Sequence, residues 1–117
     1  MTDPCVFCNY RPTPPAEIRY EWPDALAIRP LNPVTDGHTL IVPKGHVYTA
    51  ADDVVVTAAA FARAIEWSQL RPDEAFNLVT SVGPAATQTV FHLHVHYVPR
   101  REGDGLALPW TTEDRQP

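Results

Sequence analysis

Within residues 88–99, QTVFHLHVHYVP, histidine and apolar residues alternate strictly from Phe91 to Tyr97. A period of two is typical of a β-strand, whose successive side chains point to opposite faces of a sheet. We therefore expect the three histidines of this row to share one face: His92, His94 and His96. The intervening apolar side chains should pack on the other face, against a helix: Phe91, Leu93, Val95 and Tyr97.

Four other segments have the composition of short strands bounded by turn residues. They are residues 18–22, 25–30, 38–43 and 75–81. The 117 residues contain no internal repeat and no long linker, so they suit one domain. Because strands outnumber helices, we expect an α+β domain with a mainly antiparallel five-stranded sheet and one long helix. Residues 1–15 should form a cysteine knuckle and a proline-rich turn, and residues 100–117 a polar tail.

The long helix is predicted over about residues 52–70. Asp52 or Asp53 can cap its N-terminus, and Pro72 ends it. Apolar residues recur there at i, i+4, i+7 and i+11, which predicts one buried face. That face would consist of Val54, Ala58, Phe61 and Ile65.

Charge and hydropathy narrow the classes of function. A net charge of −5 without any Lys/Arg cluster argues against a nucleic-acid partner. No window approaches the ~18 apolar residues that a membrane span needs. The start, MTDPCVFC, lacks the features of a secretory signal. We therefore expect a cytoplasmic protein without membrane or nucleic-acid partners, in a compartment where structural disulfides are rare.

Three histidines in strict alternation, in a chain with five, indicate chemistry more than an incidental polar face. One interpretation is a catalytic metal held by several of them, because His-x-His on a strand is a good zinc clamp. The other is a nucleophilic histidine that attacks an electrophilic phosphorus atom. The row by itself leaves both interpretations open.

The two cysteines, Cys5 and Cys8, are close enough in CVFC to share one metal ion, and thiolates favour zinc. A redox Cys-x-x-Cys pair normally opens a helix, which the following Arg-Pro-Thr-Pro-Pro disfavours. Two unmodified thiols are the remaining alternative. A Cys₂His₂ site would need one histidine of the row and one from elsewhere. His46, in VPKGH, is a natural second donor.

Three segments taken together resemble the histidine-triad (HIT) superfamily: HLHVHYV (92–98), DGHTLIVPKGHV (36–47) and GPAATQTVFHLHVHYVPR (83–100). CVFC resembles the cysteine pair of zinc-containing members, so the similarity runs from about Cys5 to Trp110. The resemblance implies a Hint-like α+β fold and a homodimer. It also implies nucleotide hydrolase or nucleotidyl-transferase chemistry at the α-phosphate of a nucleotide conjugate, of the phosphoramidate or dinucleoside polyphosphate type.

The resemblance assigns roles as well. His94 would be the nucleophile and His96 a phosphate contact beside the leaving group. Substrate contacts would be Gln88 and Thr89, with His38 in support. The ligands of a structural zinc would be Cys5, Cys8, His46 and His92. No catalytic metal is expected, since a phosphoramidate on His94 forms and breaks readily. A metal-dependent hydrolase with zinc on the triad and a non-catalytic nucleotide-binding module are the alternatives.

Two departures from the family pattern leave the base preference open. The acidic residue that binds ribose is replaced, at the corresponding place in LAIRPLNP, by Ala27. The asparagine before the glycine of the loop is replaced by Ser81. Asn32 or Asn77 could bind ribose instead. Trp110 lies where family members place a tryptophan near a partner subunit's site.

Overall fold

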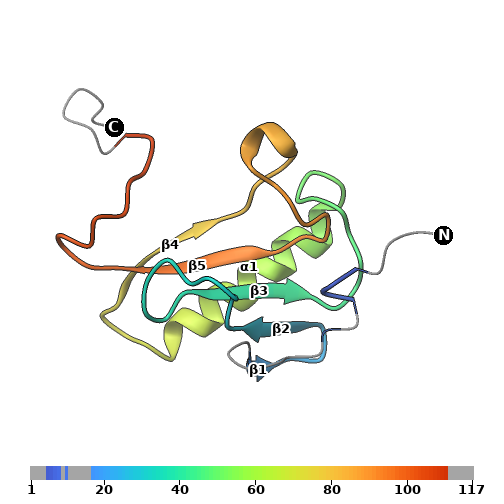
Figure 1. Ribbon diagram of the computed structural model, residues 1–117. Helices are drawn as coiled ribbons and strands as arrows, with labels where there is room; N and C mark the ends of the chain where they lie inside the picture. The colour runs from blue at the N-terminus through green and yellow to red at the C-terminus, as the bar shows by residue number, and fades with distance from the viewer. Residues whose placement is uncertain (1–4, 9, 11–16, 111–117) are drawn as a thin grey trace.

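The computed structural model describes residues 5–8, 10 and 17–110, whose five strands form one antiparallel sheet (Figure 1). The strand order is β1-β2-β3-β5-β4. The strands are β1 (Ile18–Glu21), β2 (Ala25–Ile28), β3 (Thr39–Pro43), β4 (Ala75–Val79) and β5 (Val95–Arg100). Helix α1 (Val54–Gln69) connects β3 to β4, and the 3₁₀ turn η1 (Pro84–Ala86) lies between β4 and β5. The expected α+β fold, with five antiparallel strands and one long helix, is confirmed.

Two predicted features lie outside the described residues: the proline-rich turn at 11–15 and the tail beyond residue 110. The helix of the described part of the chain is too short and too polar to cross a membrane.

Strand β5 begins later than the row of histidines. It begins at Val95, so His92 and His94 precede it, whereas the sequence predicts a strand from residue 88. The residues before β5 form a backbone hydrogen bond outside the sheet: the Leu93 N–H donates to the Val47 carbonyl at 2.7 Å. The alternation still holds, because the side chains of Leu93, Val95 and Tyr97 are all in the core. Phe91 differs from the prediction and is 44% exposed.

Helix α1 begins where the capping residues predict and buries a different face. The Asp53 carboxylate accepts a hydrogen bond from the Val56 backbone N–H at 2.9 Å. The predicted face is wrong, since Val54 is 82% exposed and Ile65 is 43% exposed. Ala58 is exposed as well, and Phe61 is only partly buried. The buried residues are Ala60, Ala64 and Trp67. Residues 54–61, VVVTAAAF, are apolar on every side, so periodicity cannot select a face there, and the alanines allow a closer approach to the sheet.

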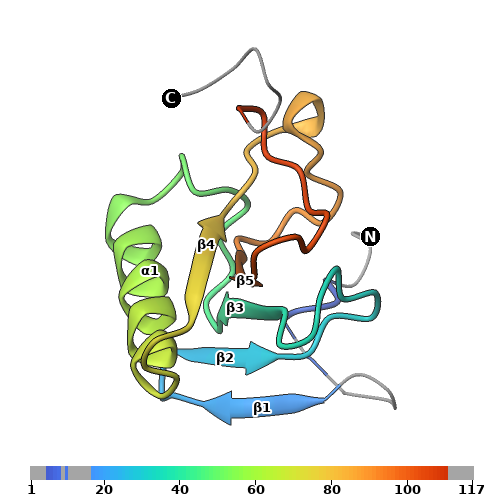
Figure 2. The same cartoon turned by 90° about the vertical axis from the view of Figure 1, so that its left-hand side faces the viewer.

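The two faces of the sheet carry different residues. Figure 2 shows α1 along one side of the sheet, where Ala27, Ile41 and Val95 join the main core. The strand register places Ile28 opposite Leu40 and Leu40 opposite His96, so these three side chains share the other face. That face carries a second cluster, on which Phe7 and Tyr10 pack. The N-terminal turn therefore lies on the histidine face, across the sheet from α1.

This register changes the interpretation of Ala27. The side chain of Ala27 is 0% exposed and belongs to the core under α1. A longer side chain at this position would point at the helix and away from the histidines. Ala27 is therefore misplaced as the counterpart of a ribose-binding residue, because a shift of one residue along a strand moves a side chain to the opposite face.

Candidate active site and metal-binding site

Four side chains converge at the end of the histidine row. The Cys5 and Cys8 Sγ atoms and the Nδ1 atoms of His46 and His92 all lie within 4.8 Å of one another. Cys5 Sγ is 3.3 Å and Cys8 Sγ is 3.6 Å from His92 Nδ1. Cys8 Sγ lies 3.0 Å from His46 Nδ1, which is 3.1 Å from His92 Nδ1. The structure thus brings together the four residues that the sequence analysis assigns to zinc.

The donor set fits a tetrahedral zinc ion. Zn–N bonds of about 2.0–2.1 Å and Zn–S bonds of about 2.3 Å give donor-to-donor edges of about 3.3–3.8 Å, close to the separations found here. The His92 Nε2–H donates to the Pro43 carbonyl at 2.7 Å, so Nδ1 presents a lone pair to the cysteines. Burial, and then the neighbouring His46 and His94, lower the pKa of His92, which keeps it in the neutral form that binds metals.

His94 is held with one ring nitrogen free. Its Nδ1–H donates to the His92 carbonyl at 2.8 Å, which leaves a lone pair on Nε2. The ring centroid lies 5.3 Å from that of Phe7 and 5.2 Å from that of His96. The Thr80 hydroxyl donates to the His94 carbonyl at 2.8 Å and fixes the backbone beneath the ring. Such a geometry can present the Nε2 lone pair to a bound ligand.

His38 and His96 form a directed pair. The Val34 backbone N–H donates to His38 Nδ1 at 3.0 Å, so the proton of a neutral His38 resides on Nε2. That Nε2–H donates to His96 Nδ1 at 2.9 Å. A neutral His96 therefore carries its own proton on Nε2, as a donor. Burial, and then the proximity of His94 and His38, lower the pKa of His96 to about 4. Burial and the nearby Arg19 likewise lower the pKa of His38.

Arg19 supports this pair from β1, and sequence reasoning missed it. Its guanidinium donates to the His38 carbonyl at 3.1 Å and to the Thr39 hydroxyl at 2.7 Å. Gly37 permits the same turn, because its φ is 87° and a Cβ there would lie only 3.0 Å from Pro99 Cγ. No local pattern marks Arg19, since β2 separates β1 from β3 in the sheet.

The loop before the row is held together by Gln88. The Gly83 backbone N–H donates to Gln88 Oε1 at 2.8 Å. The Gln88 Nε2 donates to the Tyr48 and Val90 carbonyls at 2.9 and 3.1 Å. The amide is buried and engaged with backbone, whereas Thr89 beside it is exposed. The geometry gives Gln88 a loop-positioning role and leaves Thr89 available to a ligand.

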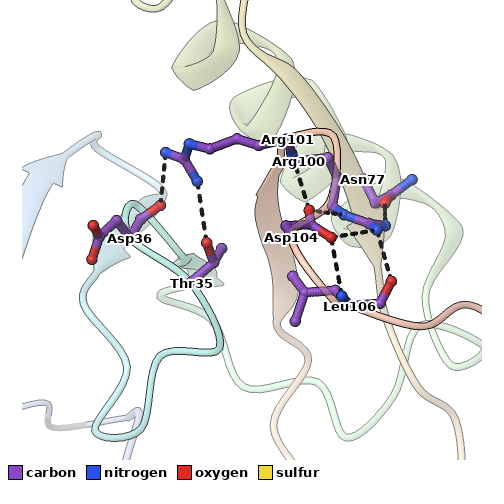
Figure 3. A network of polar contacts seen from close by, with 7 residues as sticks. All are labelled: Thr35, Asp36, Asn77, Arg100, Arg101, Asp104 and Leu106. Carbon is purple, nitrogen blue, oxygen red and sulfur yellow. Dashed lines mark hydrogen bonds and ion pairs between the residues drawn. The ribbon is translucent and has the colours of Figure 1, made fainter.

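The two asparagines considered for ribose binding have different surroundings. Asn32 is exposed on the loop between β2 and β3. Asn77 accepts a hydrogen bond from Arg100 at 2.7 Å (Figure 3). Arg100 also pairs with Asp104 at 2.9 Å and donates to the Leu106 carbonyl. The Arg100 guanidinium, and then two backbone N–H groups, hold the pKa of the Asp104 carboxyl well below its usual range.

The C-terminal segment is joined to the loop that carries His38. Arg101 donates to the Thr35 hydroxyl at 3.1 Å and to the Asp36 carbonyl at 3.5 Å (Figure 3). Beyond this network, Trp110 is 47% exposed. In Figure 1 the segment after β5 runs outward from the sheet. The described residues thus leave Trp110 free to meet another surface.

Comparisons with known proteins identify the family of the chain. The model of the HIT domain matches residues 11–103. An uncharacterized HIT-like protein of Mycobacterium tuberculosis is 39% identical over 113 residues, which cover 90% of this chain and 77% of the relative. The Arabidopsis thaliana adenylylsulfatase HINT3 is 34% identical over 119 residues, covering 97% of this chain and 59% of that protein. The chain therefore belongs to the HIT family.

Solved structures support the same conclusion. A HIT family hydrolase from Clostridium thermocellum superimposes with a TM-score of 0.75 at 28% identity, covering 92% of this chain and all of the other (100%). A zinc-bound histidine triad family protein from Mycobacterium smegmatis superimposes with a TM-score of 0.69 at 40% identity, over 88% of this chain and 79% of that one.

Proposed function

We propose that the protein is a nucleotide hydrolase or nucleotidyl transferase that acts at the α-phosphate of a nucleotide conjugate through a covalent nucleotidyl-His94 intermediate. One observation carries the proposal: the bond from His94 Nδ1–H to the His92 carbonyl, which leaves Nε2 as a lone pair beside His96. A neutral imidazole with a fixed tautomer can attack phosphorus without first losing a proton.

The chemistry would proceed in two displacements. The His94 Nε2 lone pair forms a bond to the α-phosphorus, and the bond from phosphorus to the leaving group breaks. Water then attacks the same phosphorus and releases a proton to solvent, and the phosphorus–nitrogen bond breaks to return a neutral His94. The His96 Nε2–H would donate a hydrogen bond to the phosphate or leaving group while charge develops. We expect Thr89 and the backbone of the loop held by Gln88 to contact phosphate oxygens.

The relatives are consistent with this substrate class. The Arabidopsis relative is named an adenylylsulfatase, and adenylyl sulfate is a nucleotide conjugate whose α-phosphate carries sulfate. The similar structure from Clostridium thermocellum is described as a HIT family hydrolase. Phosphoramidates and dinucleoside polyphosphates remain the other candidate conjugates. We further propose that the protein is a homodimer, with Trp110 near the partner's site.

The four-donor site would hold a structural zinc. When bound, zinc would supply the cross-link between the N-terminal turn and the sheet. The alternative of a catalytic zinc on the triad is disfavoured by geometry. Within residues 5–8, 10 and 17–110, the one group of three or more donors close enough to share an ion contains His92 and excludes His94 and His96. The Nδ1 atoms of those two histidines are engaged with a carbonyl and with His38.

Intact-mass measurement after incubation with an adenosine phosphoramidate tests the mechanism. We expect a covalent nucleotide on the wild type and none on His94→Ala, whose kcat/KM should fall by about 10³-fold or more. Full activity in His94→Ala would remove the nucleophile assignment. A metal hydrolase would instead lose activity to chelators without forming an adduct. A binding module would hold nucleotide tightly and show no more turnover than His94→Ala.

A further inference from the structure

The turn that supplies both cysteines also places an aromatic ring against the histidine row. Phe7 stands between Cys5 and Cys8 in sequence. Its ring centroid lies 5.7 Å from that of His92, with the planes at 86°. The same ring lies 5.3 Å from that of His94, with the planes at 68°. Phe7 therefore contacts a metal-site residue and the proposed nucleophile at once.

Phe7 also joins the turn to the sheet. It packs on the apolar cluster of Ile28, Leu40 and Val42, beside Tyr10. Leu40 is the strand partner of His96, so the ring covers the sheet face on which the proposed phosphate site lies. Edge-to-face packing of this kind restricts how a neighbouring imidazole can rotate. The orientation of the His94 ring thus depends on where Phe7 is held.

The position of Phe7 depends in turn on the four donors. The Cys5 and Cys8 Sγ atoms approach ring nitrogens at 3.0–3.6 Å. Since His92 donates its single proton to the Pro43 carbonyl, its Nδ1 lone pair accepts from the cysteine thiols while no metal is bound. A zinc ion bound by these four donors would replace the weak sulfur–nitrogen contacts with four bonds and hold both ends of the turn. Without zinc, only those contacts and the apolar packing of Phe7 and Tyr10 would hold the turn.

We propose that Phe7 is a positioning residue through which metal occupancy of the Cys5–Cys8–His46–His92 site sets the affinity of the adjacent site for a nucleoside monophosphate. The inference rests on the proposed function in one respect, namely that a nucleotide phosphate binds at His94. Zinc fixes Phe7, and Phe7 restricts the rotation of the His94 ring before the ligand arrives. Binding of the ligand then costs less conformational entropy. Because coupling between two ligands is reciprocal, the nucleotide tightens zinc binding by the same factor.

Competition between the zinc-loaded full chain and a chromogenic chelator, with and without saturating adenosine 5′-monophosphate, measures this coupling. In the wild type, the nucleotide should lower the apparent Kd for zinc by about fivefold or more, the usual scale of coupling between sites. Phe7→Ala should still bind one zinc per chain, yet show a nucleotide effect below about twofold. Val6→Ala is the matched control: Val6 lies in the same turn, is 60% exposed, and should leave the coupling at the wild-type value.

The measurement starts from loaded protein, so no variant has to fold without metal. Phe7→Leu, which keeps an apolar side chain on the sheet, provides a second variant and should also lose most of the coupling. The inference is overturned if nucleotide leaves the zinc affinity of the wild type unchanged, or if Phe7→Ala retains the full coupling. A covalent adduct on His94 without coupling would overturn this inference alone. Coupling without an adduct would overturn the proposed chemistry alone.

Discussion

At the residue scale, a hydrogen bond to one ring nitrogen of each histidine fixes its tautomer. That bond decides whether the other nitrogen carries a lone pair or a proton. His92 Nε2–H donates to the Pro43 carbonyl, which turns its Nδ1 lone pair to the cysteines. His94 Nδ1–H donates to the His92 carbonyl and leaves Nε2 free. His96 receives a proton donor on Nδ1 and keeps its own proton on Nε2. Three identical side chains thereby present a lone pair to the cysteines, a second lone pair on His94 and a hydrogen-bond donor on His96.

The low pKa of His96 makes stability depend on pH. Burial, with His94 and His38 nearby, lowers the pKa from 6.5 to about 4. Between these values the unfolded chain binds a proton that the folded protein does not bind, so the free energy of unfolding decreases as the pH falls. The loss begins near pH 6.5, is complete below about pH 4, and amounts to about 3 kcal/mol at most.

Urea unfolding at several pH values from 7.5 down to 4.5 checks this expectation. His96→Gln cannot bind the proton in either state, so its free energy of unfolding should fall less steeply with pH than that of the wild type. Metal release at low pH affects both proteins alike, and the difference between them isolates His96. Parallel curves for the two proteins would contradict the prediction.

At the scale of elements, the loop before β5 contains a strained residue. Thr87 follows η1 with φ of 73°, a left-handed conformation that a β-branched side chain rarely adopts. Thr87→Gly should remove strain of about 1–2 kcal/mol, partly offset by about 0.5–1 kcal/mol of added freedom in the unfolded chain. We expect unchanged or modestly higher stability in urea unfolding.

The neighbouring residue provides the control for Thr87. Ala86, inside η1, lacks a positive φ, so Ala86→Gly should lower the free energy of unfolding by about 0.5–1 kcal/mol. The two substitutions add the same residue to the same loop and should act in opposite directions. A clear loss of stability in Thr87→Gly would show that the threonine side chain contributes more than its backbone strain costs.

Elements differ in how far the sequence predicts them. The five strands and the helix were predictable because turn residues and Asp53 mark their ends. The buried face of α1 was not, since residues 54–61 offer apolar side chains in every direction and tertiary packing selects among them. The start of β5 was also missed. Alternation predicts which face Leu93 and Val95 share, and it does not reveal that the Leu93 N–H bonds to Val47.

At the scale of the whole molecule, the four-donor site joins segments that are distant in the chain. Cys5 and His92 are separated by 87 positions, so an ion bound by both would cross-link a loop that contains most of the chain. Removal of zinc by a chelator should lower the Tm by about 10 °C, and Cys5→Ser or Cys8→Ser should do the same. Calorimetry with metal analysis checks this. A metal-free preparation that melts at an unchanged temperature would contradict a structural zinc.

The candidate site was predictable to the extent that its residues carry their chemistry in short motifs. The metal donors are cysteines and histidines that can be read directly from CVFC, VPKGH and the histidine row. The fold then brings these side chains together. Arg19 lay beyond such reasoning, because its contact with His38 crosses β2 and depends on the sheet order. Ala27 was misplaced for a related reason: the face of a strand residue depends on its register with neighbouring strands.

The register of β5 with β3 also limits where residues can be inserted or deleted. One residue inserted between His92 and His96 would turn the later side chains of β5 to the opposite face, exchanging a histidine for a core side chain. The loop from Arg29 to Gly37 and the loop around η1 contain no such alternation. New substrate preferences are therefore most accessible through lengthening or shortening those two loops, while the spacing of the histidines stays constant.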